Sequence, residues 1–126
     1  YITNTMQVIG IGTDIIEIDR IAWVIDNTPR FVKRVFTPVE IDYCKARKDC
    51  YPHFAARFAA KEAVGKAIGR SLSWQDVEII NGSQGKPEVR LSGLAQRLTE
   101  GCLLMITMSH SKYYATATAL LMACDE

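Results

Sequence analysis

The stretch of sequence that decides the fold reads His53-Phe-Ala-Ala-Arg-Phe-Ala-Ala-Lys-Glu-Ala-Val-Gly-Lys-Ala-Ile-Gly69. Alanine, lysine, glutamate and arginine are strong helix formers, and Pro52 before the stretch and Gly69 at its end are typical helix boundaries. At about 100° per residue, one side of this helix carries only methyl groups, from Ala56, Ala59, Ala60, Ala63 and Ala67. We therefore predict a long central helix whose alanine face packs closely against another backbone.

A second side of the same helix places a carboxylate among aromatic and small residues. Glu62 shares this side with Phe54, Phe58, Gly65 and Gly69. Lys66 lies one turn beyond Glu62, so the simplest interpretation is an i,i+4 salt bridge worth about 0.2–0.5 kcal/mol. The alternative is a Glu62 carboxylate that binds a hard metal ion, with Lys66 directed at a phosphate. The spacing alone leaves both interpretations open.

The composition is that of one globular domain, and we expect residues 1–126 to form it. Hydrophobic residues make up 48% and charged residues 23% of the chain, which are ordinary values. No apolar run is long enough to cross a membrane and no signal peptide is recognisable, so the expected location is the cytoplasm. Met6 is a candidate natural start, with residues 1–5 as a remnant of cloning. The four cysteines form no CxxC pair, so we expect reduced thiols and no zinc site.

The positive charge of the chain is concentrated in one segment. Residues 30–70 carry ten basic and four acidic residues, a formal charge of +6, whereas the remaining residues sum to −5. Such a local field favours an anionic partner, for example a phosphorylated cofactor, an acidic protein or nucleic acid. The net charge of the whole chain is only +1, which argues against a general nucleic-acid-binding domain, because such domains are strongly basic overall.

Local patterns define the elements on either side of the central helix. A strand is expected over 7–13, where Gly10 and Gly12 indicate the close approach of another backbone, and Asp14 should end it. Thr37 and Glu40 are spaced as a capping box at the start of a helix. Helices are expected over 15–27, 37–48 and 93–100, a short helix or turn over 31–36, and strands over 77–80, 88–91, 103–108 and 113–122. Helices first and mostly antiparallel strands later indicate an α+β domain.

Polar side chains interrupt this apolar framework at three places. They are Asp14 at a strand end, Glu62 with Lys66 on the central helix, and two loops that contain Gly85-Lys86-Pro87 and Ser109-His110-Ser111-Lys112. Two carboxylates from different elements, without a histidine or cysteine cluster, suit Mg²⁺, which takes one or two carboxylates together with substrate phosphates. Nearby lysines suit the charge that grows on a phosphate during its transfer. A lone histidine such as His110 is more often structural than catalytic, and no Walker A or kinase motif is present.

Four segments of the sequence match a known family in order and spacing. They are Gly10-Ile-Gly-Thr-Asp-Ile-Ile-Glu-Ile-Asp-Arg-Ile21, Arg57-Phe-Ala-Ala-Lys-Glu-Ala-Val-Gly-Lys-Ala67, Gly85-Lys-Pro87 and Ser109-His-Ser111. Through them the chain resembles the holo-acyl-carrier-protein synthase branch of the 4′-phosphopantetheinyl transferases, from Met6 to about Met122. The resemblance implies the fold of that family, in which a long central helix packs with a small, mostly antiparallel sheet. It also implies a homotrimer with each active site between neighbouring subunits.

The resemblance further implies a Mg²⁺-dependent reaction of fatty acid biosynthesis. Coenzyme A (CoA) would donate its 4′-phosphopantetheine arm to a serine of apo acyl carrier protein and leave as adenosine 3′,5′-bisphosphate. By similarity, Asp14, Glu62 and Lys66 are the catalytic residues: the two carboxylates bind the metal, and the lysine favours the leaving group. The serine proton would go either to a site carboxylate or to a metal-bound water. The expected CoA contacts are Arg57, Lys61, Lys66, Gly85, Lys86, Pro87, Ser109, His110 and Ser111.

The resemblance also assigns the surface that receives the carrier protein. The matching positions are Arg20, Val24, Arg30 and Phe31. This agrees with the positive segment, because carrier proteins are acidic helical bundles. Relatives often place an arginine near the CoA phosphate where this chain has Asp49, so Arg47 or Lys48 would replace that contact.

Two other functions compete with this interpretation. One is a transferase that serves polyketide or peptide-synthesis carrier proteins, although such enzymes are often much longer single chains. The other is a non-catalytic module that uses its basic residues to bind an acidic protein or nucleic acid. The combination of Asp14, Glu62 and Lys66 argues against the second, because simple binding of an anion does not need two carboxylates.

Overall fold

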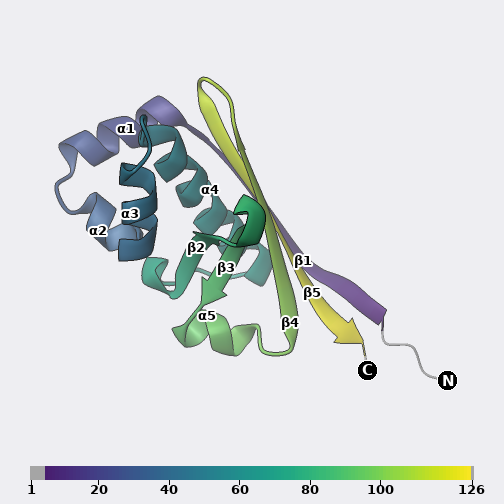
Figure 1. Cartoon of the computed structure of the whole chain (residues 1–126). Coiled ribbons are helices and arrows are strands. Elements are labelled where there is room, and N and C mark those ends of the chain that lie inside the picture. Colours follow the sequence, from purple (N-terminus) through teal and green to yellow (C-terminus); the bar gives the residue numbers. More distant parts are fainter. Residues whose placement is uncertain (1–4, 126) are drawn as a thin grey trace.

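A long antiparallel sheet and one helix form the centre of the structure, a computed structural model that describes residues 5–125 (Figure 1). Strand β5 (Tyr114–Asp125) lies between β1 (Thr5–Glu17) and β4 (Cys102–His110). Helix α4 (Tyr51–Ile68) packs along one face of this sheet. The predicted α+β fold, a long central helix with a small antiparallel sheet, is therefore confirmed. The expectation that residues 1–5 are a remnant of cloning concerns residues that, apart from Thr5, lie outside the described part of the chain. The side chain of Cys124, one of the four thiols expected to be reduced, lies outside it too.

Shorter elements surround this centre. Three helices cover one end of α4, namely α1 (Ile18–Asn27), α2 (Phe31–Val35) and α3 (Pro38–Lys45). A separate hairpin pairs β2 (Val77–Asn81) with β3 (Pro87–Leu91), and α5 (Gly93–Leu98) leads from it to β4. Single 3₁₀ turns, η1 (Trp74–Asp76) and η2 (Ser83–Gly85), flank β2. No helix within residues 5–125 is long and apolar enough to cross a membrane.

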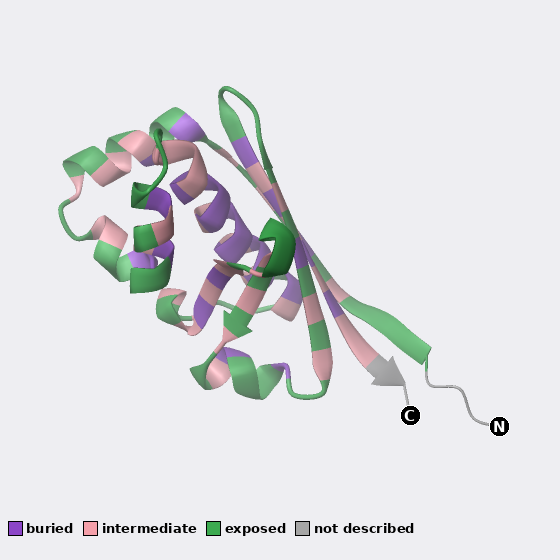
Figure 2. Ribbon diagram, in the orientation of Figure 1, coloured by how far each residue is buried: buried purple, intermediate pink, exposed green. Residues whose placement is uncertain are grey.

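Small residues on both partners allow α4 and β1 to pack closely. The five alanines of the predicted face are all buried, at 0–5% exposure (Figure 2). A Cβ added to Gly12 would collide with the carbonyl oxygen of Ala63, and one added to Gly10 would collide with that of Ala67. The predicted close approach of two backbones is thus confirmed, and it requires glycine at both positions of β1.

A buried ion pair ties α4 to its neighbours on the other side. Thr37 and Glu40 form the predicted capping box, in which the Glu40 carboxylate accepts the Thr37 N–H at 2.8 Å. The same carboxylate is also 2.8 Å from the Lys61 Nζ of α4 and accepts the N–H of Ile79 in β2 at 2.7 Å. Lys61 donates its other hydrogens to the backbone carbonyls of Trp74 and Val77. Every donor and acceptor of this interior pair therefore has a partner.

Some element boundaries differ from the predictions, and for two of them the reason is that distant strands pair. Strand β1 continues through Asp14 to Glu17, since residues 13–17 pair with 114–118 of β5, and the following helix begins only at Ile18. Strand β4 continues to His110, opposite Ala115, so the predicted loop over 109–112 is shorter than expected. Helix α3 ends at Lys45, three residues earlier than predicted.

Replacement of Gly12 by alanine tests the contact between β1 and α4. We expect Gly12→Ala to lower the free energy of unfolding by about 1–3 kcal/mol, because overpacking a tight contact forces the backbone to shift. The matched control is Gly65→Ala, whose Cβ would meet only the Arg70 carbonyl oxygen at an ordinary 3.4 Å. Alanine is the better helix residue, so this control should keep or raise stability. Urea unfolding of both variants measures the difference, and a Gly12→Ala protein as stable as its parent would contradict this packing.

Candidate functional site

The carboxylates of Asp14 and Glu62 come from different elements and line the same hollow. Asp14 is fixed on β1, where its backbone carbonyl accepts a hydrogen bond of 2.8 Å from Thr116 Oγ1. Glu62 lies on α4, and both side chains contribute to a hollow of about 500 Å³ beside α1. Partial burial, and next the negative charge of Asp14, raise the pKa of Glu62, while Lys66 opposes the shift. The two carboxylates that the resemblance assigns to one metal ion thus line the same hollow, and their role as metal ligands stays a prediction.

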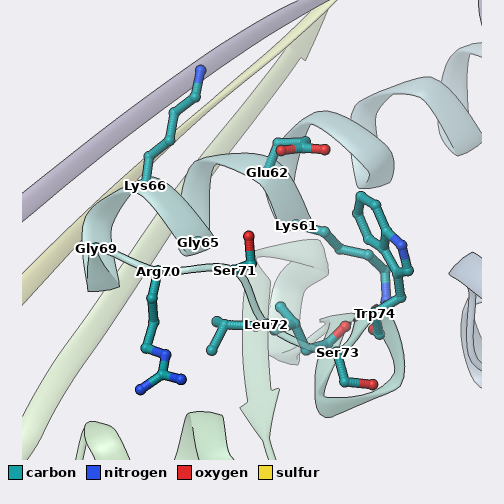
Figure 3. Close-up of a pocket in the computed structure, with 11 residues that line it drawn as sticks. Lys61, Glu62, Gly65, Lys66, Gly69, Arg70, Ser71, Leu72, Ser73 and Trp74 are labelled. Carbon is teal, nitrogen blue, oxygen red and sulfur yellow. Dashed lines mark hydrogen bonds between the residues drawn. The ribbon is translucent and has the colours of Figure 1, made fainter.

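Lys66 reaches across to β1 and does not simply pair with Glu62. Its Nζ donates to the Thr13 carbonyl oxygen at 2.9 Å and lies 3.5 Å from Asp14 Oδ1. Figure 3 shows the Lys66 side chain directed toward the strands while Glu62 leaves the helix on a neighbouring side. The Lys66 side chain is 55% exposed, so its ammonium group is accessible to an anionic ligand.

A second hollow adjoins the first at Glu62. It has a volume of about 490 Å³ and is lined by Lys66, Arg70, Leu72 and Trp74 besides Glu62 (Figure 3). The Trp74 ring stacks on Phe58, which lines the first hollow, with ring centroids 5.2 Å apart. Because Glu62 lines both hollows, it stands on the ridge between them. Two ligands can therefore approach one carboxylate from two sides.

The carboxylate pair offers the oxygen ligands that a hard divalent cation prefers. Besides burial, the negative charge of Asp14 raises the pKa of Glu62, and a cation between the two carboxylates would relieve this repulsion. Within residues 5–125, no group of three or more histidine, cysteine, aspartate or glutamate residues could hold a metal ion. The protein would thus supply two oxygen ligands, which suits Mg²⁺ because this ion takes its remaining ligands from phosphates and water.

A second cluster of candidate residues forms around Arg57 on another side of α4. Arg57 is only 2% exposed, and its guanidinium group donates to Asn81 Oδ1 at 2.6 Å. The amide nitrogen of Asn81 donates to the Gly85 carbonyl oxygen at 3.2 Å. This chain of contacts links α4 to the predicted loop that contains Gly85, Lys86 and Pro87.

Aromatic rings complete this second cluster. The Tyr43 and His53 ring centroids are 6.0 Å apart, and those of His53 and His110 are 5.8 Å apart. Burial, and next the positive charges of Arg57, His110 and Arg47, lower the pKa of His53. His110, at the end of β4, therefore lies beside His53, which is one helical turn before Arg57 on α4. Arg57 and Arg47 thus gather positive charge near His53.

The predicted site residues divide between two flanks of α4. Arg57 and Glu62 are five positions apart, which places them about 140° apart around the helix axis. Between them, on the side away from the sheet, Lys61 is buried in its ion pair with Glu40. Of the remaining predicted contacts, Ser111 closes the hairpin turn through its N–H to the Tyr114 carbonyl oxygen, whereas Lys86 and Ser109 are exposed.

The predicted carrier-protein positions lie mostly around the first hollow. Arg20, Val24 and Phe31 line it together with Asp14 and Glu62. Arg30 is exposed and lines a separate shallow hollow of positive residues with Lys33 and Arg34. Three of the four positions thus surround the carboxylate pair.

Sequence reasoning missed the residues that support both clusters. Tyr43, His53, Asn81 and Trp74 were not predicted as site residues. The i,i+4 spacing of Tyr43 and Arg47 in the helix predicted over 37–48 was an available signal, because such a pair can stack. The contact between Tyr43 and Arg57 crosses from α3 to α4, and no local pattern reports it.

Comparison with known proteins relates this geometry to one family. The family model described as the 4′-phosphopantetheinyl transferase superfamily matches residues 10–118. A holo-[acyl-carrier-protein] synthase of Protochlamydia amoebophila is 50% identical over 117 residues, which are 89% of this chain and 96% of the relative. One of Ruminiclostridium cellulolyticum is 45% identical over 124 residues, which are 91% of this chain and 92% of the relative. The crystal structure of a holo-(acyl-carrier-protein) synthase from Bacillus anthracis in complex with CoA (3′,5′-ADP) matches with a TM-score of 0.80 and 34% identity, covering 94% of this chain and 99% of that one.

The raised pKa of Glu62 predicts that its negative charge lowers the stability of the folded protein at neutral pH. A carboxyl group whose pKa is higher in the folded state destabilises the protein above that pKa, and the effect disappears below the pKa of the unfolded chain. Glu62→Gln should therefore raise the thermal unfolding midpoint at pH 7.5 in the presence of a chelator, and the gain should vanish near pH 3.5. The matched control is Glu100→Gln, an exposed carboxylate, which should change little at either pH. A lower midpoint for Glu62→Gln at pH 7.5 would contradict the destabilising effect assigned to the burial of this charge and its repulsion by Asp14.

Proposed function

The chain belongs to the 4′-phosphopantetheinyl transferase superfamily, and from this membership we propose how its side chains carry out the transfer. The enzyme moves the 4′-phosphopantetheine group of CoA to a serine of apo acyl carrier protein, and adenosine 3′,5′-bisphosphate leaves. The serine Oγ forms the new bond to phosphorus, and the bond from that phosphorus to the bridging oxygen of the pyrophosphate breaks. The observation that carries the assignment is the Asp14 and Glu62 pair in one hollow, with Glu62 also lining the second hollow.

Asp14 and Glu62 are the proposed ligands of Mg²⁺. When bound, this ion would offset the negative charge of the CoA pyrophosphate. Lys66 lies beside the pair, held 2.9 Å from the Thr13 carbonyl oxygen, and its exposed ammonium group donates to the phosphate that departs. A fixed positive charge at that point stabilises the negative charge as it moves onto the leaving group.

The two hollows suggest which substrate approaches from which side. The hollow beside α1 is surrounded by Arg20, Val24 and Phe31, so it is the proposed entry of the carrier-protein serine. A cation beside apolar side chains suits an acidic helical partner. Arg30, with its neighbours Lys33 and Arg34, extends the positive surface on the same side of the chain.

The cluster around Arg57 is the proposed site for the nucleotide end of CoA. Buried, hydrogen-bonded Arg57, together with His110, Gly85 and Lys86, offers positive charge and backbone groups. It lies on the other flank of α4 from Glu62, with the helix between the two clusters. One CoA molecule would therefore contact Glu62 of one subunit and Arg57 of a neighbouring subunit, and the active site would be shared.

An uncovered apolar surface supports the proposal of a homotrimer. The face of the sheet away from α4 exposes large apolar side chains, including Ile11 and Ile15, each at 65%, Leu103 at 49% and Met105 at 42%. Contiguous exposed apolar residues of this kind mark an association surface. The trimer, the role of Mg²⁺, the part played in fatty acid biosynthesis and the cytoplasmic location remain predictions of the family resemblance.

Intact mass of an apo acyl carrier protein tests the proposed function. After incubation with the parent enzyme, CoA and Mg²⁺, the carrier should gain one phosphopantetheine group, and a chelator should prevent the gain. Glu62→Gln should reduce the initial rate by at least about 10²-fold, because it removes a ligand charge at the reacting phosphate. Glu100→Gln again serves as the control and should transfer at the rate of the parent. Near-normal, metal-dependent transfer by Glu62→Gln would remove the metal assignment, and no transfer by the folded parent would favour the non-catalytic binding module.

A further inference from the structure

The glutamine of the turn η1, Gln75, holds the end of helix α2. Its amide nitrogen donates to three backbone carbonyl oxygens, those of Lys33 at 3.1 Å, Arg34 at 3.2 Å and Phe36 at 3.0 Å. The last carbonyl groups of a helix have no partner within that helix, and the two hydrogens of an amide nitrogen can be shared among several acceptors. One side chain from a distant part of the sequence therefore caps the C-terminal end of α2.

Helix α2 needs such support because it is short. It has five residues and begins without a hydrogen bond from a capping side chain in the described structure. A helix of this length is not stable in isolation. In the protein, Val35 is only 3% exposed, and the Phe31 ring centroid lies 6.1 Å from those of both Phe36 and Phe58. These apolar contacts hold the inner face of α2, and Gln75 fixes its end.

The turn that carries Gln75 is itself fixed to the core of the protein. On one side of Gln75, the Trp74 carbonyl oxygen accepts a hydrogen bond of 2.9 Å from the Nζ of buried Lys61. On the other side, the Asp76 carbonyl oxygen accepts the N–H of Ser92 at 3.0 Å. Gln75 therefore joins α2 to a turn whose position is set by α4 and by the start of α5.

Helix α2 presents much of the surface that the proposed function assigns to the carrier protein. Lys33 and Arg34 are exposed and line a shallow hollow together with Arg30. Phe31, at the start of the same helix, lines the hollow that contains Asp14. The direction of these positive charges, and the place of Phe31 relative to the carboxylates, thus depend on how α2 is held.

We propose that Gln75 is a positioning residue for the carrier protein, whose amide group holds α2 so that Phe31 and the cations of this helix form one preformed docking surface. This inference rests on the proposed function and deepens it. A preformed surface loses less conformational entropy on binding than a surface that must first be ordered. Among the described residues, Gln75 lines neither of the two hollows at Glu62, so it acts through α2 and not by contact with CoA or the reacting serine.

Replacement of Gln75 by methionine removes the hydrogen-bond donor and keeps the length of the side chain. We expect Gln75→Met to raise the dissociation constant of apo acyl carrier protein, measured by calorimetry, by about fivefold, which matches the loss of one hydrogen bond. The KM for the carrier protein should rise by the same factor. The kcat at saturating carrier and the KM for CoA should stay within about twofold of the parent values, because only binding of the carrier changes. The matched control is Gln96→Met, an exposed glutamine of α5, which should change none of these constants.

Hydrogen exchange in the free enzyme measures the positioning of α2 itself. In Gln75→Met, the backbone amides of residues 31–36 should exchange about fivefold faster than in the parent, because the end of the helix opens more often. The amides of β5 should exchange at the rate of the parent, and Gln96→Met should leave both regions unchanged.

The inference is overturned if Gln75→Met binds the carrier protein as tightly as the parent, or if the KM for CoA rises together with that for the carrier. Faster exchange throughout the chain, or unchanged exchange in α2, would also overturn it, because Gln75 would then have no specific effect on α2. A parent that binds the carrier in a way that depends on Gln75 but transfers nothing would keep this inference and overturn the proposed function. A parent that does not bind the carrier would overturn both.

Discussion

The close approach of β1 to α4 is the constraint on which the reactive site depends. Gly10 and Gly12 leave no side chain between the strand and the alanine face of the helix, so the two backbones nearly touch. Asp14 follows two positions later on the same strand, and this proximity brings its carboxylate and the Thr13 carbonyl oxygen to Lys66. A bulkier residue at Gly12 would push the strand outward and separate the two carboxylates. The packing of the core and the geometry of the site are thus set by the same contact.

The buried pair of Glu40 and Lys61 fixes the opposite flank of the same helix. A charge that is removed from water is costly unless all its hydrogen-bonding groups are satisfied, and this pair meets that condition through contacts with α3, β2 and the Trp74 carbonyl oxygen. It therefore holds the segment that forms one wall of the second hollow. The resemblance assigns Lys61 to CoA, which stays a prediction; in the structure its ammonium group binds protein atoms. Lys61 and Glu62 are adjacent in sequence, yet one supports the interior and the other faces the ligands.

Patterns of short range were sufficient to predict much of this fold. The alanine periodicity of α4, the capping box of Thr37 and Glu40, and the small residues of β1 each report a local constraint, and each is confirmed. The sequence could not show that β1 continues through Asp14, because that extension depends on pairing with β5 at the far end of the chain. For the same reason it could not show that one ring, that of Tyr43, contacts both Arg47 and Arg57, because the two arginines come from different elements. The family resemblance supplied the roles of Asp14, Glu62 and Lys66, and the structure supplied the separation of the site into two clusters.

That separation leads to the central claim, that neighbouring subunits share each active site. The direct measurement is transfer activity of mixed oligomers, formed by refolding Glu62→Gln and Arg57→Ala chains together. Each variant alone should be nearly inactive, and an equal mixture should regain about a quarter of the parent activity, because a random ring pairs an intact Glu62 with a neighbour's intact Arg57 at one site in four. A mixture that assembles fully but stays as inactive as its components would contradict the shared site. It would mean that Glu62 and Arg57 of the same chain serve one active site.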